Sequence, residues 1–502
     1  MAYRLLKILS NSIFLTVLIF IIFSILRIIP ESSIGQYPTG FDTINAYPLY
    51  FTSKITFLDS IRHFDLFHFL VYSVNDKFSI GSIWTTLKVW GVVLYGGLVA
   101  SFFAYLVYGQ RLKKGQALVI SMIFGLSLST LRISMELFRN ELGLILMFIG
   151  LIFWENITLK IKPGNIFNLF LFIIFGLLVY GAHELTTILL FLVIGSKITA
   201  YSLSRRNFYW QAVVFLLFFL ILILTPIIIE DIAWLKMKLW TNFLITNTTQ
   251  TIHFSAVPNL VAGFFLFLYG ALLPWAILGL IIKRINYFAI LLLLLTYISI
   301  SPIIYSGYGF YIWDRWMYLI IIPLSYLSYF GLEYISLKSE QLWKASGSIL
   351  LSVCLVFILW KPIAFLCSGG ENSPISAIKL PDSRLSDIFP SSLADNSLHQ
   401  FNKSINNDFI ARFNKLNKEN IPAVIDRSFS GYVILGGIKA PLIEAFYGKL
   451  PPSRQLELAL RNYPFYTIND TYGLKNWTGT KTIGTITVYK FEKIENKELK
   501  KK

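Results

Sequence analysis

Long apolar runs constrain this chain more than any other feature of its sequence. A helix that crosses a bilayer needs about 18 or more mostly apolar residues, and we find about eleven candidate spans, some of them shorter. Of the 502 residues, 55% are hydrophobic and only 14% are charged, too few for the surface of a soluble protein. The expected fold class is mainly α, a polytopic bundle of about eleven transmembrane helices.

The charges predict how the spans are oriented. Arg4 and Lys7 precede the first span, which lacks a cleavage site, so we expect an uncleaved helix and a cytoplasmic N-terminus. The formal net charge is +17, and much of it lies in short loops, where it sets orientation rather than binding nucleic acid. Cys354 and Cys367 exclude a disulfide framework. We expect a multi-pass protein of the cell (plasma) membrane.

The predicted inner loops are short and basic, whereas the outer loops hold most of the carboxylates. The apolar run 166–201 is too long for one span and has basic residues on both flanks, so a hairpin with His183-Glu184 at its outer tip is expected. The predicted spans are residues 13–29, 84–109, 117–131, 142–154, two within 166–201, 210–229, 260–282, 288–304, 317–335 and 348–360.

An odd number of spans places the C-terminal segment outside the cell. We expect residues 1–367 to form the membrane domain, with a long first outer loop over residues 30–83. Residues 368–495 are expected to form a small extracytoplasmic α/β domain, and the basic residues 496–502 a disordered tail.

Within the C-terminal segment, residues 421–426 and 482–491 have strand patterns. The pattern of residues 433–447 predicts a helix there, broken at Gly436-Gly437 and Pro441.

The ionisable residues of the membrane domain gather at outer helix ends. They are Asp42, Arg132, Glu136, Arg139, His183, Glu184, Asp314 and Arg315. A transporter needs polar groups near the bilayer midplane, whereas an enzyme acting on a lipid headgroup needs them at one interface, so the distribution favours the enzyme. No P-loop, dinucleotide fingerprint, zinc motif or nucleophile elbow is present, which argues against a nucleotide-driven pump.

A polar stripe precedes the fourth span. Arg132, Glu136, Arg139 and Asn140 are spaced i, i+4, i+7 and i+8. On one helix they would share a face, where the two guanidiniums would grip a phosphate or pyrophosphate and Glu136 would orient them. A solvated, salt-bridged helix end would show the same pattern.

Asp42 lies among turn formers near the start of the first outer loop. A carboxylate there suits a general base, because a sugar hydroxyl is a weak nucleophile that must lose its proton as it attacks an anomeric carbon. Asp42 would equally suit the N-cap of a helix beginning at Thr43. Asp59 and Asp65 are rival bases in the same loop.

The first outer loop also holds His63, Asp65 and His68, so a divalent cation stays open, although we assign no metal ligand and no cofactor. The spacing of these residues is loose. The neighbouring Phe57 and Leu58 favour an amphipathic helix that lies in the membrane interface.

Two further pairs lie at outer helix ends. His183-Glu184 would contact a substrate or merely end two helices, and its membrane depth favours a functional role. Asp314-Arg315 would pair internally and anchor at the interface, or Arg315 would bind a donor phosphate.

In their order along the chain, these motifs resemble the GT-C superfamily of polytopic membrane glycosyltransferases, particularly its uncharacterised archaeal and bacterial members. The likeness covers nearly all of the membrane part and ends with an extracytoplasmic C-terminal domain. It rests on Gly40-Phe41-Asp42, the hairpin tip 132–140, His183-Glu184-Leu185-Thr186 and Asp314-Arg315-Trp316.

The resemblance implies an inverting hexosyltransferase-like enzyme that uses a polyprenyl-phosphate (dolichyl-phosphate) sugar at the outer membrane face. It implies Asp42 as the base and Arg132, Arg139 and Arg315 as ligands of the donor phosphate. The Trp-Trp-Asp signature of oligosaccharyltransferases and the paired Asp-Glu of protein mannosyltransferases are absent, which favours transfer of one sugar to a glycan, lipid or protein. The remaining substrate-site residues would be Glu136, Asn140, His183, Glu184 and Asp314.

Two other classes of function stay open. A transporter or flippase for a lipid-linked or anionic solute predicts polar groups along a path through the bilayer. A non-catalytic envelope scaffold, with the C-terminal domain as its binding module, predicts that the outer residues do not converge.

Overall fold

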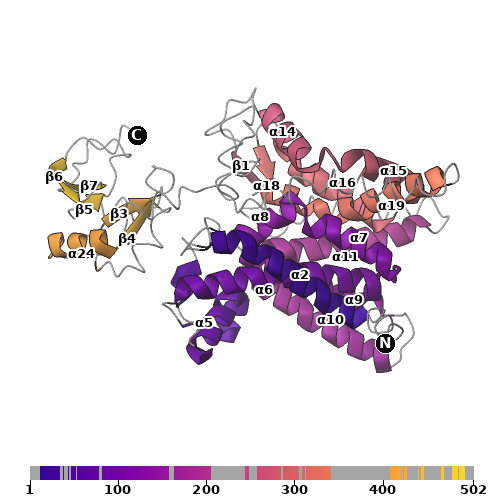
Figure 1. Cartoon of the computed structure of the whole chain (residues 1–502), viewed down its shortest axis with the longest axis horizontal. Helices are drawn as coiled ribbons and strands as arrows, with labels where there is room; N and C mark the ends of the chain where they lie inside the picture. The colour runs from indigo at the N-terminus through magenta and orange to yellow at the C-terminus, as the bar shows by residue number, and fades with distance from the viewer. Residues whose placement is uncertain are drawn as a thin grey trace, which may run out of the picture. The chain divides into compact units, whose positions relative to one another are not determined.

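The protein is mainly helical, as the sequence predicts (Figure 1). By its internal contacts the chain divides into two compact units. The first unit comprises Met1–Ser33, Ile55–Leu70 and Val89–Pro390. The second comprises Ile34–Lys54, Val71–Lys88 and Ser391–Lys502. The structure is a computed structural model that describes residues 12–33, 38, 43, 47–51, 54–78, 82–157, 163–204, 244–247, 257–283, 286–304, 308–310, 313–340, 407–419, 421, 423–426, 439, 442–445, 465–467, 477–483 and 486–491.

Five described helices are long and apolar enough to cross a membrane, and the number rises to seven if each of two bent helix pairs is one span. Apolar side chains are exposed on two of these helices, as expected where helices face lipid: Ile25 on the helix Ser12–Ser33 and Phe170 on the helix Pro163–Ala182. The expected spans 210–229 and 348–360 lie outside the described residues. The five are α2 (Ser12–Ser33), α6 (Ile83–Ala104) with the π-helix η2 (Tyr105–Gly109), α10 (Pro163–Ala182), α11 (Glu184–Ser204), and α18 (Trp313–Leu319) with α19 (Ile321–Glu340).

Two bends correct the expectation of straight spans over residues 117–131 and 260–282. Ser127 starts the helix after the first bend by accepting a hydrogen bond from the Thr130 N–H at 3.1 Å. Hydropathy does not register such a cap, so the apolar run looks continuous in the sequence. The bent pairs are α7 (Lys114–Gly125) with α8 (Leu128–Glu136), at 62°, and α14 (Val257–Tyr269) with α15 (Leu273–Lys283), at 78°.

Helix α9 (Phe138–Glu155) packs against both α10 and α11 in the first unit. Near its end, the rings of Trp154 and of Phe172 in α10 have centroids 5.0 Å apart. At the same end, Glu155 pairs with Lys197 of α11. The chain therefore runs away from this end in α10 and returns in α11, with the reversal at His183 that the hairpin expectation requires.

A polar cluster marks the Glu155 end of α9. The Lys197 Nζ lies 4.7 Å from the centroid of the Tyr287 ring and 5.3 Å from that of Tyr105. The Gln110 amide donates to Glu155 and, at 2.9 Å, to the Tyr105 hydroxyl. Ion pairing and cation–π contacts offset the cost of removing this ammonium group from water.

Shorter elements complete the part of the chain before residue 341. The expected span 288–304 is divided into two helices, because the first ends at Ser299 and the second begins at Ser301. β1 and β2 pair antiparallel. These elements are η1 (Tyr47–Phe51), α4 (Phe57–Arg62), α5 (Leu66–Phe78), β1 (Leu244–Asn247), α16 (Tyr287–Ser299), α17 (Ser301–Ile304) and β2 (Tyr308–Phe310).

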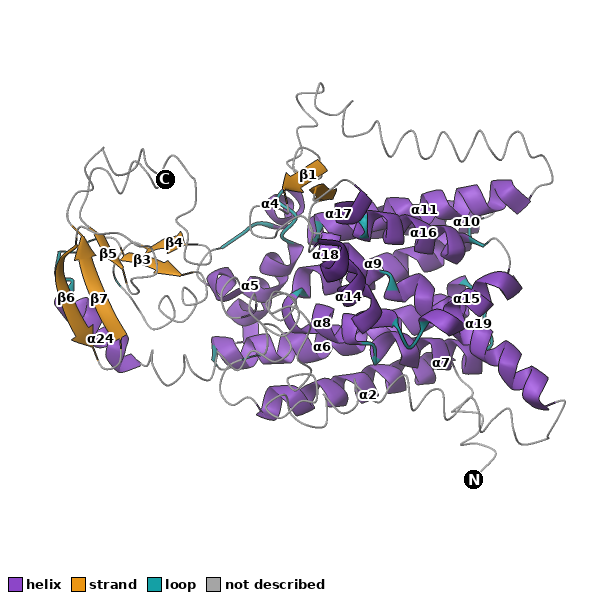
Figure 2. Cartoon of the chain, turned by 90° about the horizontal axis from the view of Figure 1, so that it is seen from above, coloured by secondary structure: helices purple, strands orange, loops and turns teal. Residues whose placement is uncertain are grey.

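The C-terminal segment contains a mixed five-stranded sheet in the order β4-β3-β5-β7-β6 (Figure 2). The helix expected over residues 433–447 is wrong at residues 442–445, which form a strand parallel to β3. The strand expected over residues 482–491 is confirmed at residues 486–491, which form β7, whereas residues 482 and 483 end the preceding strand β6, which pairs antiparallel with β7. The elements are α24 (Asn407–Leu416), β3 (Ala423–Asp426), β4 (Leu442–Ala445), β5 (Phe465–Thr467), β6 (Trp477–Ile483) and β7 (Ile486–Phe491).

Candidate functional site

The candidate site is built on the junction between α8 and α9. Leu137 separates the two helices with φ −104° and ψ 51°. Leu137 is also the N-cap residue of α9 and has no side-chain acceptor, so it does not cap the first-turn N–H groups. A helix N-terminus carries partial positive charge and attracts anions. The junction therefore favours a negatively charged ligand.

The same junction corrects the expectation that four polar residues share one helical face. Arg132 and Glu136 belong to α8, whereas Arg139 and Asn140 belong to α9. A shared face requires one uninterrupted helix, and the break at Leu137 changes the direction of the side chains that follow it.

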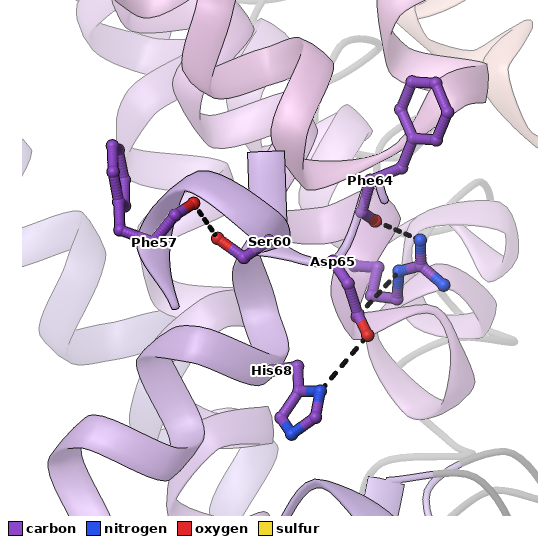
Figure 3. Close-up of polar contacts among 6 residues, drawn as sticks. Phe57, Ser60, Phe64, Asp65 and His68 are labelled. Carbon is purple, nitrogen blue, oxygen red and sulfur yellow. Dashed lines mark hydrogen bonds and ion pairs between the residues drawn. The ribbon is translucent and has the colours of Figure 1, made fainter. Parts of the chain in front are cut away.

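Arg139, in the first turn of α9, is bound by the segment that joins α4 to α5. Its guanidinium donates to the Phe64 carbonyl oxygen, and its Nε lies 3.6 Å from the Asp65 Oδ1. The Asp65 Oδ2 lies 3.3 Å from the His68 Nδ1, so one carboxylate bridges the arginine and the histidine (Figure 3). Phe64 has a φ of 56°, in the left-handed region that residues other than glycine rarely adopt.

His183 lies in the one-residue break between α10 and α11, outside both apolar helices. Its Nδ1 accepts a hydrogen bond from the Leu185 N–H at 3.0 Å, so it caps the N-terminus of α11. Burial lowers the pKa of His183 well below its ordinary value, and the guanidiniums of Arg139 and Arg315 lower it further. The imidazole is therefore neutral at neutral pH, and both guanidiniums lie close enough to act on it.

Arg132 approaches the same region from α8. It is only 9% exposed, and its guanidinium carbon lies 5.8 Å from the centroid of the Tyr318 ring. Tyr318 and Arg315 are three residues apart on α18 and share a helical face. The structure thus places Arg132 against the helix that carries Arg315, and the charges of Arg139 and Arg315 both act on the pKa of His183.

Buried charges on α2 and α9 belong to the same part of the bundle and were missed by the sequence reasoning. The Arg27 Nη2 lies 2.8 Å from the Glu31 Oε1 and 3.4 Å from the Ser134 carbonyl oxygen of α8. Glu141 is fully buried, and neither carboxylate oxygen has a hydrogen-bond partner among the described residues. The usable signal was Arg27 itself, an ionisable residue inside the first apolar run.

The structure describes some of the other sequence-predicted residues in full, some by their backbone only, and one not at all. Asp42 lies outside the described residues, and the structure describes only the backbone of Glu136 and Asp314. Asn140 is buried, and its Oδ1 has no hydrogen-bond partner in the described part of the chain. Glu184 is half-buried at the start of α11.

The candidate cation ligands of the first loop form no metal cluster. His63 is exposed where α4 ends, whereas Asp65 and His68 pair with each other. The guanidinium of Arg139 stands beside the Asp65 carboxylate, where a cation would otherwise bind. Within the described ranges, no group of three His, Cys, Asp or Glu side chains is arranged to hold a metal ion.

Chemically, the site combines three guanidiniums, a helix start without a side-chain cap and a bridged carboxylate. Guanidinium groups and helix N-termini both donate to phosphate oxygens, so the combination suits an anionic ligand. No family model matches this chain, and a comparison with curated proteins finds no significant match.

Proposed function

We propose that this protein is a membrane glycosyltransferase that moves a sugar from a polyprenyl-phosphate donor to a glycan, lipid or protein acceptor. The observation that carries the proposal is the position of Arg139 in the first turn of α9, which lacks a side-chain cap, together with the guanidiniums of Arg132 on α8 and Arg315 on α18. Guanidiniums bind phosphate oxygens bidentately, and this end of the bundle therefore suits the phosphate of a lipid carrier.

The proposed reaction is one inverting displacement. The acceptor hydroxyl oxygen attacks the anomeric carbon while the bond from that carbon to the phosphate oxygen breaks, and polyprenyl phosphate leaves with the bonding electron pair. A carboxylate takes the hydroxyl proton, and the arginines stabilise the charge on the departing phosphate. Asp42 is the proposed base, because the rival Asp65 is already engaged by Arg139 and His68.

We place the protein in the plasma membrane with about eleven spans and a cytoplasmic N-terminus. The support is the predicted alternation of short basic inner loops with acidic outer loops. On this topology, the site and residues 368–495 lie outside the cell. The sheet β3–β7 supports treating those residues as an α/β domain.

Transfer assays on the protein in nanodiscs test the proposal. Polyprenyl phosphates that carry different radiolabelled sugars are offered with glycan, lipid and peptide acceptors, and release of polyprenyl phosphate is measured. Asp42→Asn should lower the rate by about 10²- to 10⁴-fold, the usual contribution of acid–base catalysis. Asp76→Asn, at an exposed carboxylate of the same loop, is the matched control and should keep the rate.

Two outcomes of these assays would count against the proposal. Full transfer by Asp42→Asn would remove Asp42 as the base. Binding of a donor with no release of polyprenyl phosphate, for every sugar and acceptor offered, would overturn transfer as the function.

The two bent helix pairs favour a second candidate, a transporter or flippase for a lipid-linked or anionic solute. Broken helices often build transport sites near the bilayer midplane. The candidates differ in whether the carrier is cleaved. Movement of an intact fluorescent polyprenyl-phosphate sugar across a proteoliposome bilayer, without cleavage, would support transport.

A further inference from the structure

Asp65 forms an ion pair with the Arg139 guanidinium, the group that a phosphate would also bind. The Asp65 carboxylate and the Phe64 carbonyl oxygen both face the Arg139 guanidinium (Figure 3). Phosphate oxygens would compete with the Phe64 carbonyl oxygen for the guanidinium N–H groups, and a phosphate beside Arg139 would repel the Asp65 carboxylate, whose contact with the Nε is an ion pair at 3.6 Å. A phosphate that binds Arg139 would therefore weaken the contact with Asp65.

The segment that carries Asp65 is held in an unfavourable backbone conformation. Phe64 has a φ of 56°, and its ring packs against Tyr180 of α10 with centroids 4.6 Å apart. Such a conformation persists only where the surrounding contacts hold it. The Arg139 contacts with Phe64 and Asp65 are two of those contacts. Their loss would allow Phe64 and Asp65, which form the joint between α4 and α5, to move.

Helix α4, which precedes the joint, has the character of a membrane-surface element. Phe57 is 49% exposed and Leu58 is 57% exposed, while the neighbouring Arg62 side chain is 65% exposed. Apolar and basic side chains together on a short helix are typical of the membrane interface. A phosphate borne by a lipid would reach the protein at the same level.

We propose that Asp65 is an electrostatic latch, which holds Arg139 in the ligand-free protein and is displaced by the phosphate of a lipid headgroup. Displacement releases the α4–α5 joint, defined as Phe64 and Asp65. The inference rests on the proposed function, because it takes Arg139 as a phosphate ligand. The coupling is reciprocal, so a weaker latch strengthens phosphate binding and a bound phosphate loosens the joint.

A purely structural Asp65 predicts the opposite sign. If Asp65 only positioned Arg139, loss of its charge would leave the guanidinium less ordered and would weaken phosphate binding. Tighter phosphate binding after loss of the Asp65 charge therefore indicates a latch, and weaker binding indicates that Asp65 only positions Arg139.

Binding of a polyprenyl phosphate to the protein in phosphatidylcholine nanodiscs measures that sign. Asp65→Asn should lower the Kd about tenfold, within the usual range of coupling between sites. Asp76→Asn, at an exposed carboxylate of α5, should leave the Kd unchanged. In an Arg139→Gln background, Asp65→Asn should give no gain, because the two changes act through one contact. A Kd for Asp65→Asn at or above that of the wild type overturns the latch.

Hydrogen exchange over residues 57–65 measures directly how mobile the joint is. This measurement needs no Arg139→Gln variant, so it holds even if that variant does not fold. Asp65→Asn should raise exchange there without ligand, and polyprenyl phosphate should raise it in the wild type. Unchanged exchange in Asp65→Asn, or protection of the wild type by the ligand, overturns the latch.

Phosphatidic acid and inorganic phosphate, used in parallel, separate this inference from the proposed function. If phosphatidic acid alone binds more tightly to Asp65→Asn and loosens the joint, the latch stands and the polyprenyl donor fails. If inorganic phosphate alone does so, the lipid source is wrong and the latch fails as stated. If no phosphate-bearing ligand prefers Asp65→Asn, the latch is overturned whatever the transfer assays show.

Discussion

At the scale of single residues, protonation of His183 at Nδ1 would remove the hydrogen bond that caps the N-terminus of α11. The His183 Nδ1 must be unprotonated to accept from the Leu185 N–H, and the pKa of His183 is lowered by burial and then by Arg139 and Arg315. Below about pH 6.5 the unfolded chain binds a proton here that the folded protein does not, so stability falls as the pH falls. Thermal unfolding in detergent should show a loss of up to about 1.4 kcal/mol per pH unit from this residue.

His183→Asn isolates the titration, because asparagine can cap a helix but does not titrate. This variant should lose that part of the acid dependence, whereas His183→Ala should also lose about 1 kcal/mol at neutral pH with the cap. His63→Asn, at an exposed histidine, is the matched control and should keep the wild-type dependence. An unchanged acid dependence in His183→Asn would mean that another group causes it.

At the scale of elements, α15 and α19 approach each other through two glycines. A Cβ at Gly279 would lie 1.9 Å from the Leu327 carbonyl oxygen, and one at Gly331 would lie 2.0 Å from the Trp275 carbonyl oxygen. Small residues allow this approach between membrane helices. Gly279→Ala and Gly331→Ala should each lower the free energy of unfolding by about 1–3 kcal/mol, the usual cost of overpacking.

Gly176→Ala provides the matched control, because a Cβ at Gly176 meets nothing within 4 Å. This variant should be neutral or slightly stabilising, since alanine favours a helix over glycine by about 1 kcal/mol. Thermal unfolding of the three purified variants in one detergent compares them. Equal losses in all three would show that helix contact is not the cause.

The elements also show what the sequence could predict and what it could not. The expected span 13–29 corresponds to α2, which is long and apolar enough to cross a membrane, and residues 142–154 lie in a helix, α9, because the length of an apolar run is visible in the sequence. The strand at residues 442–445 was missed because its pairing with β3, distant in the sequence, decides its conformation. At the site, Arg139 and Arg315 lie in the first turns of α9 and α18, at helix ends as the sequence predicted, whereas Arg132 lies in the middle of α8. The contact of Asp65 with Arg139 was not predictable, because it depends on packing between distant segments.

At the scale of the whole molecule, α9 separates two polar clusters. Arg139 and its partners lie at its start, and Glu155 with Lys197 lies at its end. The helix has 18 residues, which at the usual rise gives about 27 Å, close to the roughly 30 Å of a hydrocarbon core. If α9 crosses a bilayer, the two clusters lie at opposite membrane surfaces, as the proposed topology requires.

This separation predicts which exposed positions can be labelled from outside a cell. In a chain with Cys354→Ser and Cys367→Ser, Arg62→Cys tests the Arg139 end and Lys113→Cys the Glu155 end, because both positions are exposed. A membrane-impermeant maleimide on intact cells should modify Arg62→Cys, and should modify Lys113→Cys only after permeabilisation, because basic inner loops stay in the cytoplasm. The reverse result would place the arginine cluster in the cytoplasm, where a donor facing the outer leaflet could not reach it. Labelling of both without permeabilisation would mean that α9 does not cross the bilayer and that the two polar clusters lie on the same side of it.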